Sequence, residues 1–416
     1  MYSLLLAIIY IAFISLGLPD SLIGAGWPVM HRDLDVPIGV AGILTMIIAG
    51  GTIFSSLASE RVTRRFGVGL VTAVSVGMTA AALIGFSVSG EFWMLCLWAI
   101  PYGLGAGAVD AALNNYVAVH YAARHMNWLH ACWGLGASIS PFVMSWSLTA
   151  GLGWTSAYLI IGLIQVALTL ALLSSIPLWG KVNPVRSPES TDAADAAATT
   201  DPDADTAAAS PAPARAHVPL SRAVRIPGVP LILAAFFAYC ALETTAILWA
   251  SSYLVADRGV SPATAAAFAS LFVLGITAGR FLAGFVADRI GDRWMIRGGF
   301  IAVGVGAVML TLPVGTDAVA LVGLVVAGLG SAPIYPAIIH STPVNFGREN
   351  SQAIIGIQMA AAYAGSTLAP PLFGAIAAVT GLGIFPVYIL LLVALGLVMS
   401  ERLNVRVRGR DTITAA

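Results

Sequence analysis

The chain has 416 residues, of which 58% are hydrophobic and only 10% are charged, whereas a soluble domain carries about 25% charged residues. Its 20 acidic and 20 basic side chains cancel, so the net charge gives no reason to expect nucleic acid as a partner. Composition therefore indicates a polytopic protein of a lipid bilayer. The three cysteines, Cys96, Cys132 and Cys240, lie in apolar segments without disulfide or metal-ligand spacing.

Hydropathy predicts an all-α membrane protein with twelve transmembrane helices, because a spanning helix needs about 20 apolar residues. The first segment has neither a basic start nor a cleavage site, so we interpret it as a helix and not as a removed signal peptide. The helices are expected at about 2–30, 38–58, 67–88, 92–120, 127–150, 154–178, 229–255, 262–287, 295–313, 318–341, 351–377 and 382–400.

These helices divide into two six-helix halves, residues 1–180 and 227–401, followed by a tail at 402–416. Residues 181–226 are rich in Ala, Asp, Thr and Pro and lack core-forming side chains, which predicts a disordered linker. Nearly all basic loop residues fall on one side of the predicted bilayer, and only Arg32 and Arg258 fall on the other. Basic loops face the cytoplasm, so we expect a plasma-membrane protein with both termini and the linker inside.

The two halves repeat each other. SERVTRRFG follows the second helix and ADRIGDRWM follows the eighth, so that Glu60-Arg61 corresponds to Asp288-Arg289. Gly-Leu-Gly also recurs in the fourth and tenth helices, at 103–105 and 328–330. A parallel repeat of this kind is typical of transporters whose solute site lies at mid-membrane between the halves.

The loop sequences resemble the signature loop of the major facilitator superfamily, most closely in GFVADRIGDR, residues 284–293. Within it, three stretches are similar to the fucose:proton symporter family, which includes glucose and galactose carriers. They are VDAALNNYV in the fourth helix, MNWLHACWGLGA in the fifth and FFAYCALETTAILWASSYL in the seventh. The resemblance implies the twelve-helix fold of that superfamily and proton-coupled sugar uptake. The chain departs from the family at three positions. His130 replaces an amide, and Trp133 replaces a polar residue. Asp20 lies about two helical turns earlier in the first helix than the acid that family members carry there.

Two intramembrane acids are candidates for carrying the coupled proton. Asp110 lies in a glycine- and alanine-rich helix near mid-bilayer, and burial there disfavours the charged carboxylate. Asp20 follows Pro19, where a break in the first helix exposes backbone groups that must face protein or a cavity. The alternatives are a hydrogen bond that holds two helices together for Asp110 and satisfaction of the loosened backbone for Asp20.

Polar and aromatic residues near these acids are candidates for solute binding. Their side chains can hydrogen-bond hydroxyl groups or stack on the apolar face of a sugar, although each could instead serve packing. The candidates are Asn114, Asn127, His130, Trp133, Tyr239 and Glu243.

The repeated loops are candidates for a cytoplasmic gate formed by helix ends, with plain positive-inside charge as the alternative. The residues are Glu60, Arg61, Arg65, Asp288, Arg289 and Arg293. Arg280 lies inside the eighth helix, where it could extend toward the interface or pair with an acid such as Glu243. Pairing would help to hold one state of the transport cycle.

We therefore predict a proton symporter that imports a small polar solute, with a monosaccharide as the first candidate. Its partners are the solute, protons and the bilayer, with no obligate protein partner. No P-loop, nucleophile elbow or metal-ligand cluster is present, so we expect no enzyme activity, cofactor or metal. A proton-antiport exporter of sugars or small amphipathic compounds is the alternative. Sodium coupling stays open, and a non-transporting sensor would usually need a soluble output domain.

Overall fold

The structure is a computed structural model that describes residues 2–20, 22–37, 40–179, 219–260, 262–312 and 317–414. Most of the segment predicted to be a linker lies outside the described residues. Its last part contains a short helix, α9. The helices of the first half are α1 (Tyr2–Gly17), α2 (Leu22–Asp33), α3 (Ala41–Phe66), α4 (Val68–Ser87), α5 (Phe92–His120), α6 (Ala123–Thr149) and α7 (Gly153–Trp179). Those that follow are α9 (Leu220–Arg225), α10 (Val229–Ala256), α11 (Pro262–Ile290), α12 (Asp292–Thr311), α13 (Ala318–Ser331), α14 (Ile334–Phe346), α15 (Arg348–Thr380), the 3₁₀ turn η2 (Leu382–Ile384) and α16 (Phe385–Thr414).

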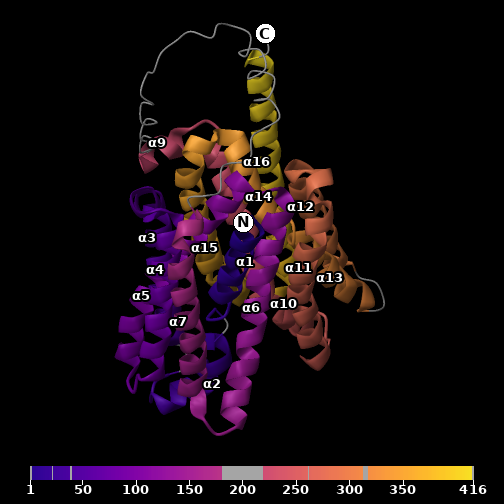
Figure 1. The fold of residues 1–416 in the computed structure, drawn as a ribbon. Helices are drawn as coiled ribbons and strands as arrows, with labels where there is room; N and C mark the ends of the chain where they lie inside the picture. The colour runs from indigo at the N-terminus through magenta and orange to yellow at the C-terminus, as the bar shows by residue number, and fades with distance from the viewer. Residues whose placement is uncertain are drawn as a thin grey trace, which may run out of the picture.

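These helices confirm the all-α fold of two six-helix halves, which stand side by side in Figure 1. Among the described residues, eleven helical spans are long and apolar enough to cross a membrane. The twelfth is α6, which has 27 residues but carries several polar side chains, including Asn127 and His130. It packs in the middle of the bundle, against α1 of its own half and α11 and α14 of the other.

Two of the twelve spans are broken. The first divides into α1 and α2 around Pro19, as its proline and glycines predicted. The tenth divides into α13 and α14 at Pro333, where we had expected one helix over 318–341. Proline lacks the N–H that would continue the hydrogen-bond ladder, and this break turns Tyr335 and the rest of α14 toward the other half, where α14 contacts α5 and α6.

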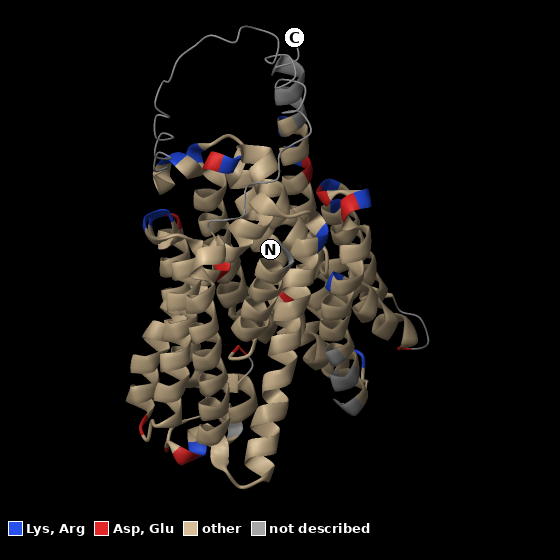
Figure 2. Cartoon of the chain, viewed as in Figure 1, with Lys and Arg blue, Asp and Glu red and all other residues tan. Residues whose placement is uncertain are grey.

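Charged residues gather at the two ends of the bundle, as Figure 2 shows. We call one end the basic end, because the arginine-rich ends of α3 and α11 lie there together with α9. The helix α16 begins a turn after Gly381 and runs past this end. The other end, toward which α2 runs, is called the opposite end (Figure 1).

Small residues let helices of the bundle approach closely. A Cβ atom on Gly136 of α6 would lie 1.9 Å from the carbonyl oxygen of Ile14 in α1, and one on Gly17 would lie 2.1 Å from that of Trp133. Helix packing in membranes depends on such contacts, because lipid supplies little hydrophobic drive between helices. The α1–α6 contact holds the broken first span beside α6.

We predict that Gly136→Ala lowers stability by about 1–3 kcal/mol, because the new methyl group overlaps the backbone of α1. The thermal unfolding midpoint of purified protein in detergent measures the effect. Gly50→Ala in α3 is the matched control, because its Cβ would have no atom within 4 Å and alanine favours the helix. Equal midpoints for the two variants would contradict the packing argument.

Candidate functional site

Asp110 lies about three turns from the basic end of α5 and is 5% exposed. Both of its carboxylate oxygens accept hydrogen bonds. The Asn114 side-chain amide, one turn on, donates to Oδ1 at 2.7 Å, and the Tyr363 hydroxyl donates to Oδ2 at 2.8 Å. Tyr363 belongs to α15 of the second half. The buried acid therefore bridges the two halves through a single side-chain contact.

His130 extends this chain of hydrogen bonds. Its Nε2 lies 3.0 Å from the Asn114 Oδ1 atom, which can only accept, so Nε2 carries the hydrogen. The imidazole ring lies edge-on to Tyr335, with ring centroids 4.5 Å apart. Asp110, Asn114, His130 and Tyr363 form what we call the Asp110 cluster.

A second polar group lies within the second half. Arg280 of α11 donates from Nη2 to Glu243 Oε1 of α10 at 3.0 Å and to the Tyr239 hydroxyl at 3.3 Å. The Arg280 and Glu243 side chains are only 4% and 14% exposed. We call these three residues the Arg280 cluster. The pairing of Arg280 with Glu243, which the sequence left open, is confirmed, and because both charged residues belong to the same half, their ion pair does not join the two halves.

Tyr335 lies between the two clusters. Its ring contacts the rings of Phe236 and Tyr239, at 4.6 and 6.2 Å between centroids, and the Arg280 guanidinium lies 5.9 Å from its centre. The break before α14 places this side chain here. Since the same ring touches His130, the two clusters are neighbours across the boundary between the halves.

Asp20 occupies the break between α1 and α2 and is exposed. The Tyr102 hydroxyl donates to one carboxylate oxygen at 3.0 Å, and Trp133 Nε1 donates to the other at 2.9 Å. The Trp133 ring lies 6.0 Å from the Arg280 guanidinium. Asp20 is thus an accessible acid that is linked through Trp133 to the buried Arg280 cluster.

Asn127, predicted to bind solute, lies outside these clusters. It is buried, and its side-chain amide donates to the Ala123 carbonyl of its own helix at 3.1 Å. The other five predicted binding residues, Asn114, His130, Trp133, Tyr239 and Glu243, all lie in or beside the clusters.

The two halves contact each other at the basic end through several polar contacts. Asp288 of α11 accepts from the Arg124 backbone N–H at 3.0 Å and lies 3.2 Å from the Arg124 guanidinium. His340 of α14 lies 3.3 Å from the Tyr121 carbonyl and 2.7 Å from Asp292 in its own half. Further inter-half hydrogen bonds join Asn115 to Ser351, Ser59 to Gln352, and the Trp128 indole to the Phe281 carbonyl.

The predicted gate residues do not all lie in this interface. Glu60 pairs with Arg64 of its own helix at 3.9 Å, and Arg293 lies 3.9 Å from Glu401 of α16, in the same half. Arg65 lies over the ring of its neighbour Phe66. Asp288 is the predicted gate residue whose described ion pair joins the two halves.

Four residues that contact the predicted ones were not identifiable from the sequence, namely Tyr102 beside Asp20, Arg124 beside Asp288, Tyr335 beside His130 and Tyr363 beside Asp110. Each is an ordinary tyrosine or arginine within a helix, and no local pattern marks its partner. A polar side chain among small residues, as in Tyr363 near Gly365, is the available signal.

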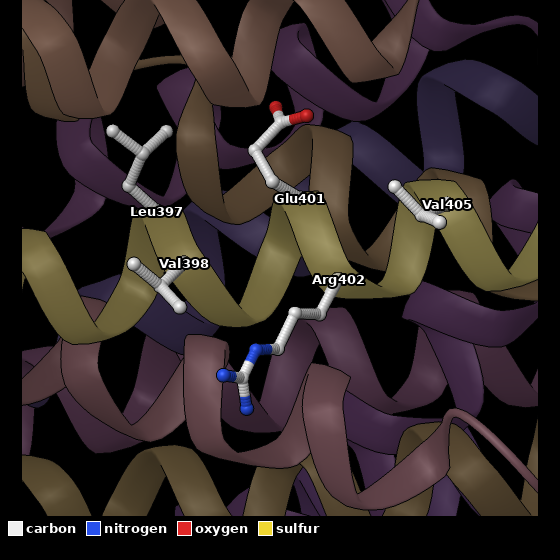
Figure 3. A pocket seen from close by; sticks show the side chains of 5 residues that line it. All are labelled: Leu397, Val398, Glu401, Arg402 and Val405. Carbon is white, nitrogen blue, oxygen red and sulfur yellow. The ribbon is translucent and has the colours of Figure 1, made fainter.

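A hollow of about 490 Å³ lies along α16, lined by Leu397, Val398, Glu401, Arg402 and Val405 (Figure 3). It lies on the surface of a helix that contributes no residue to either cluster. It is therefore not the site built around Asp110 and Arg280.

We predict that Arg280→Gln alone destabilises the protein by about 3–5 kcal/mol, because it leaves the Glu243 carboxylate buried without its cation. The double variant Glu243→Gln/Arg280→Gln removes both charges and should lose much less. Unfolding midpoints of the two variants in detergent test this. A double variant no more stable than Arg280→Gln would show that the pair does not act as a unit.

The model of the Major Facilitator Superfamily matches residues 9–230 and 231–410 of the chain. A structure of the E. coli fucose:proton symporter FucP in the outward conformation is similar, with a TM-score of 0.74 and 15% identity over 96% of this chain and 98% of that one. "Bypass of stop codon protein 6" of Saccharomyces cerevisiae is 23% identical over 67% of this chain, and the 4-hydroxybenzoate transporter PcaK of Acinetobacter baylyi is 26% identical over 42%. The matched regions cover 56% and 39% of these two relatives, respectively.

Proposed function

Because the chain belongs to the major facilitator superfamily, a family of transporters and not of enzymes, we propose that it imports a small polar solute together with protons. A monosaccharide is the first candidate solute, since the similar structure is that of a fucose:proton symporter. The observation that carries the proposal is the position of Asp110. It is a buried carboxylate whose two oxygens contact one residue of each half.

Protonation of Asp110 would change the contact between the halves. An ionised carboxylate accepts from both Asn114 and Tyr363, and such charge-assisted bonds are about twice as strong as neutral ones. A proton on Oδ2 would turn that oxygen into a donor, and the Tyr363 hydroxyl would have to become the acceptor. Proton binding therefore weakens one tie between the halves, which is how a proton can favour a different arrangement of them.

The solute would bind between the two clusters. Asn114, His130, Tyr239 and Glu243 provide donors and acceptors there, and Trp133 provides an aromatic face. Asp20 is the second candidate proton carrier, because it is exposed and linked to Trp133. Asn127 is not part of this proposal, since its amide bonds to its own helix.

The basic end would face the cytoplasm of a cell whose plasma membrane the protein spans, with both termini inside. The structure would then be an outward-facing state, closed on the cytoplasmic side by Arg124–Asp288 and His340–Tyr121. We assign the gate to these contacts. Arg61, Arg65, Arg289, Glu60 and Arg293 would act there as basic-end charges or as supports within one half.

We expect Asp110→Asn to bind and exchange solute without moving protons, because the amide resembles the neutral acid in shape. External pH is recorded in a lightly buffered suspension of de-energised cells, while sugars are added one at a time. The unmodified protein should alkalinise the medium with its solute, and the variant should not, although counterflow of labelled solute persists.

Glu91→Gln is the matched control for this experiment, because Glu91 is an exposed acid that precedes the same helix. Proton movement that survives Asp110→Asn would remove Asp110 from the coupling. Acidification instead of alkalinisation would indicate proton antiport, and the exporter would then replace the symporter as the function.

Asp288→Asn should shift the protein toward the state that is open at the basic end. Arg124 and Asp288 are 51% and 34% exposed, and such pairs contribute up to about 1 kcal/mol, so the population shift is at most about fivefold. Spin labels at exposed Phe66 and Val344 report the opening by electron–electron distance measurement. Arg289→Gln serves as the control, and an unchanged distance distribution in Asp288→Asn would remove this pair from the gate.

A further inference from the structure

We propose that the transported solute carries a carboxylate group and that Arg280 binds it, an inference that rests on the proposed proton symport. Arg280 is the one buried Lys or Arg among the described residues, with 3% of its surface exposed. A cation in the middle of a membrane protein is costly and marks functional sites. Glu243 is the described ion-pair partner of this cation.

The hydrogen bonds of Arg280 leave the Nε donor of its guanidinium without an acceptor. Both bonds to the described residues come from Nη2, one to Glu243 and one to the Tyr239 hydroxyl. The Nε atom is buried and has no acceptor. Buried donors are nearly always paired, so an orphaned Nε–H at the centre of a transporter indicates a missing acceptor. A carboxylate fits best, because one of its oxygens can accept from Nε, and a hydrogen bond between a guanidinium and a carboxylate is about twice as strong as a neutral one.

The surroundings of Arg280 place its guanidinium at the boundary between the halves. The guanidinium lies 6.0 Å from the Trp133 ring of the first half and 5.9 Å from the Tyr335 ring of the second. Trp133 also donates to Asp20, which is exposed at the break in the first span. A solute carboxylate on Arg280 would thus lie between two aromatic faces, beside an accessible polar group.

Charge balance favours an anion that travels with a proton. Glu243 neutralises Arg280, and Asp20 accepts hydrogen bonds from two neutral donors. A monocarboxylate bound at Arg280, together with a proton on Asp110, adds no net charge to this low-dielectric region. A neutral sugar with one proton would add one positive charge. The neutral donors and acceptors of Asn114 and His130 would serve hydroxyl groups without any buried cation.

The proposal predicts electroneutral transport, which proteoliposomes of the purified protein can test. The probes are two matched pairs, glucuronate with glucose and 4-hydroxybenzoate with 4-hydroxybenzyl alcohol. Each pair shares a skeleton and differs in the carboxylate, and the two pairs distinguish a sugar acid from an aromatic acid. We expect at least one carboxylate to accumulate about tenfold faster than its neutral partner. A pH gradient, alkaline inside, should drive it, and a potassium-valinomycin potential at equal pH should not.

Variants connect the carboxylate preference to Arg280. The double variant Glu243→Gln/Arg280→Gln is checked for folding by its unfolding midpoint. Its ratio of carboxylate uptake to uptake of the neutral partner should be lower by about tenfold or more. Arg280→Lys keeps the charge but lacks the Nε donor, and it should show a weaker preference. Asp110→Asn should still exchange the carboxylate across the membrane without a pH response, which separates anion binding from proton coupling.

The outcomes distinguish this inference from the proposed function. Faster uptake of a neutral partner, or no carboxylate preference in either pair, would overturn the carboxylate inference and leave proton symport standing wherever uptake still follows the pH gradient. Carboxylate uptake that ignores the pH gradient would overturn proton coupling and keep the anion site. A full preference in the double variant would remove Arg280 from that site.

Discussion

The low dielectric of the bundle interior is the constraint on which the rest of the structure depends. A charge placed there must be paired, neutralised or supplied with donors. Asp110 has two donors and Arg280 has Glu243. The few charges of the interior are therefore organised into small clusters, and these clusters lie where helices of both halves meet. The same constraint makes a proton or an anionic solute able to alter the arrangement, because either one changes the local charge.

The two clusters have different structural roles. The Asp110 cluster crosses the boundary through Tyr363, so in the proposed symport its protonation would change how the halves fit together. The Arg280 cluster lies within one half and would move with it in the proposed transport cycle, so the ion pair would stay intact throughout. Tyr335 touches members of both. A solute that reached this ring would therefore lie beside both the boundary between the halves and the Arg280–Glu243 ion pair.

Much of the fold was predictable because hydropathy and repeated motifs are local. The spans, the two halves and the break at Pro19 follow from apolar runs, glycine and proline, and the repeated loops. The second break, at Pro333, lay in a run that reads as one apolar helix. Of the site, the acids and His130 stand out as polar residues in apolar helices. Their partners do not, because a tyrosine such as Tyr363 looks the same whether it faces lipid or a carboxylate.

The sequence by itself determined that the chain is a twelve-helix membrane protein with a small number of buried acids. The tertiary structure decided which charged residues bridge the two halves and which do not. Asp288 and Arg293 have similar loop positions, but one pairs with Arg124 across the boundary and the other with Glu401 in its own half. Pairing depends on which helix faces cross, and those crossings are set by contacts between residues far apart in the chain, such as Gly136 against Ile14. No local pattern encodes them.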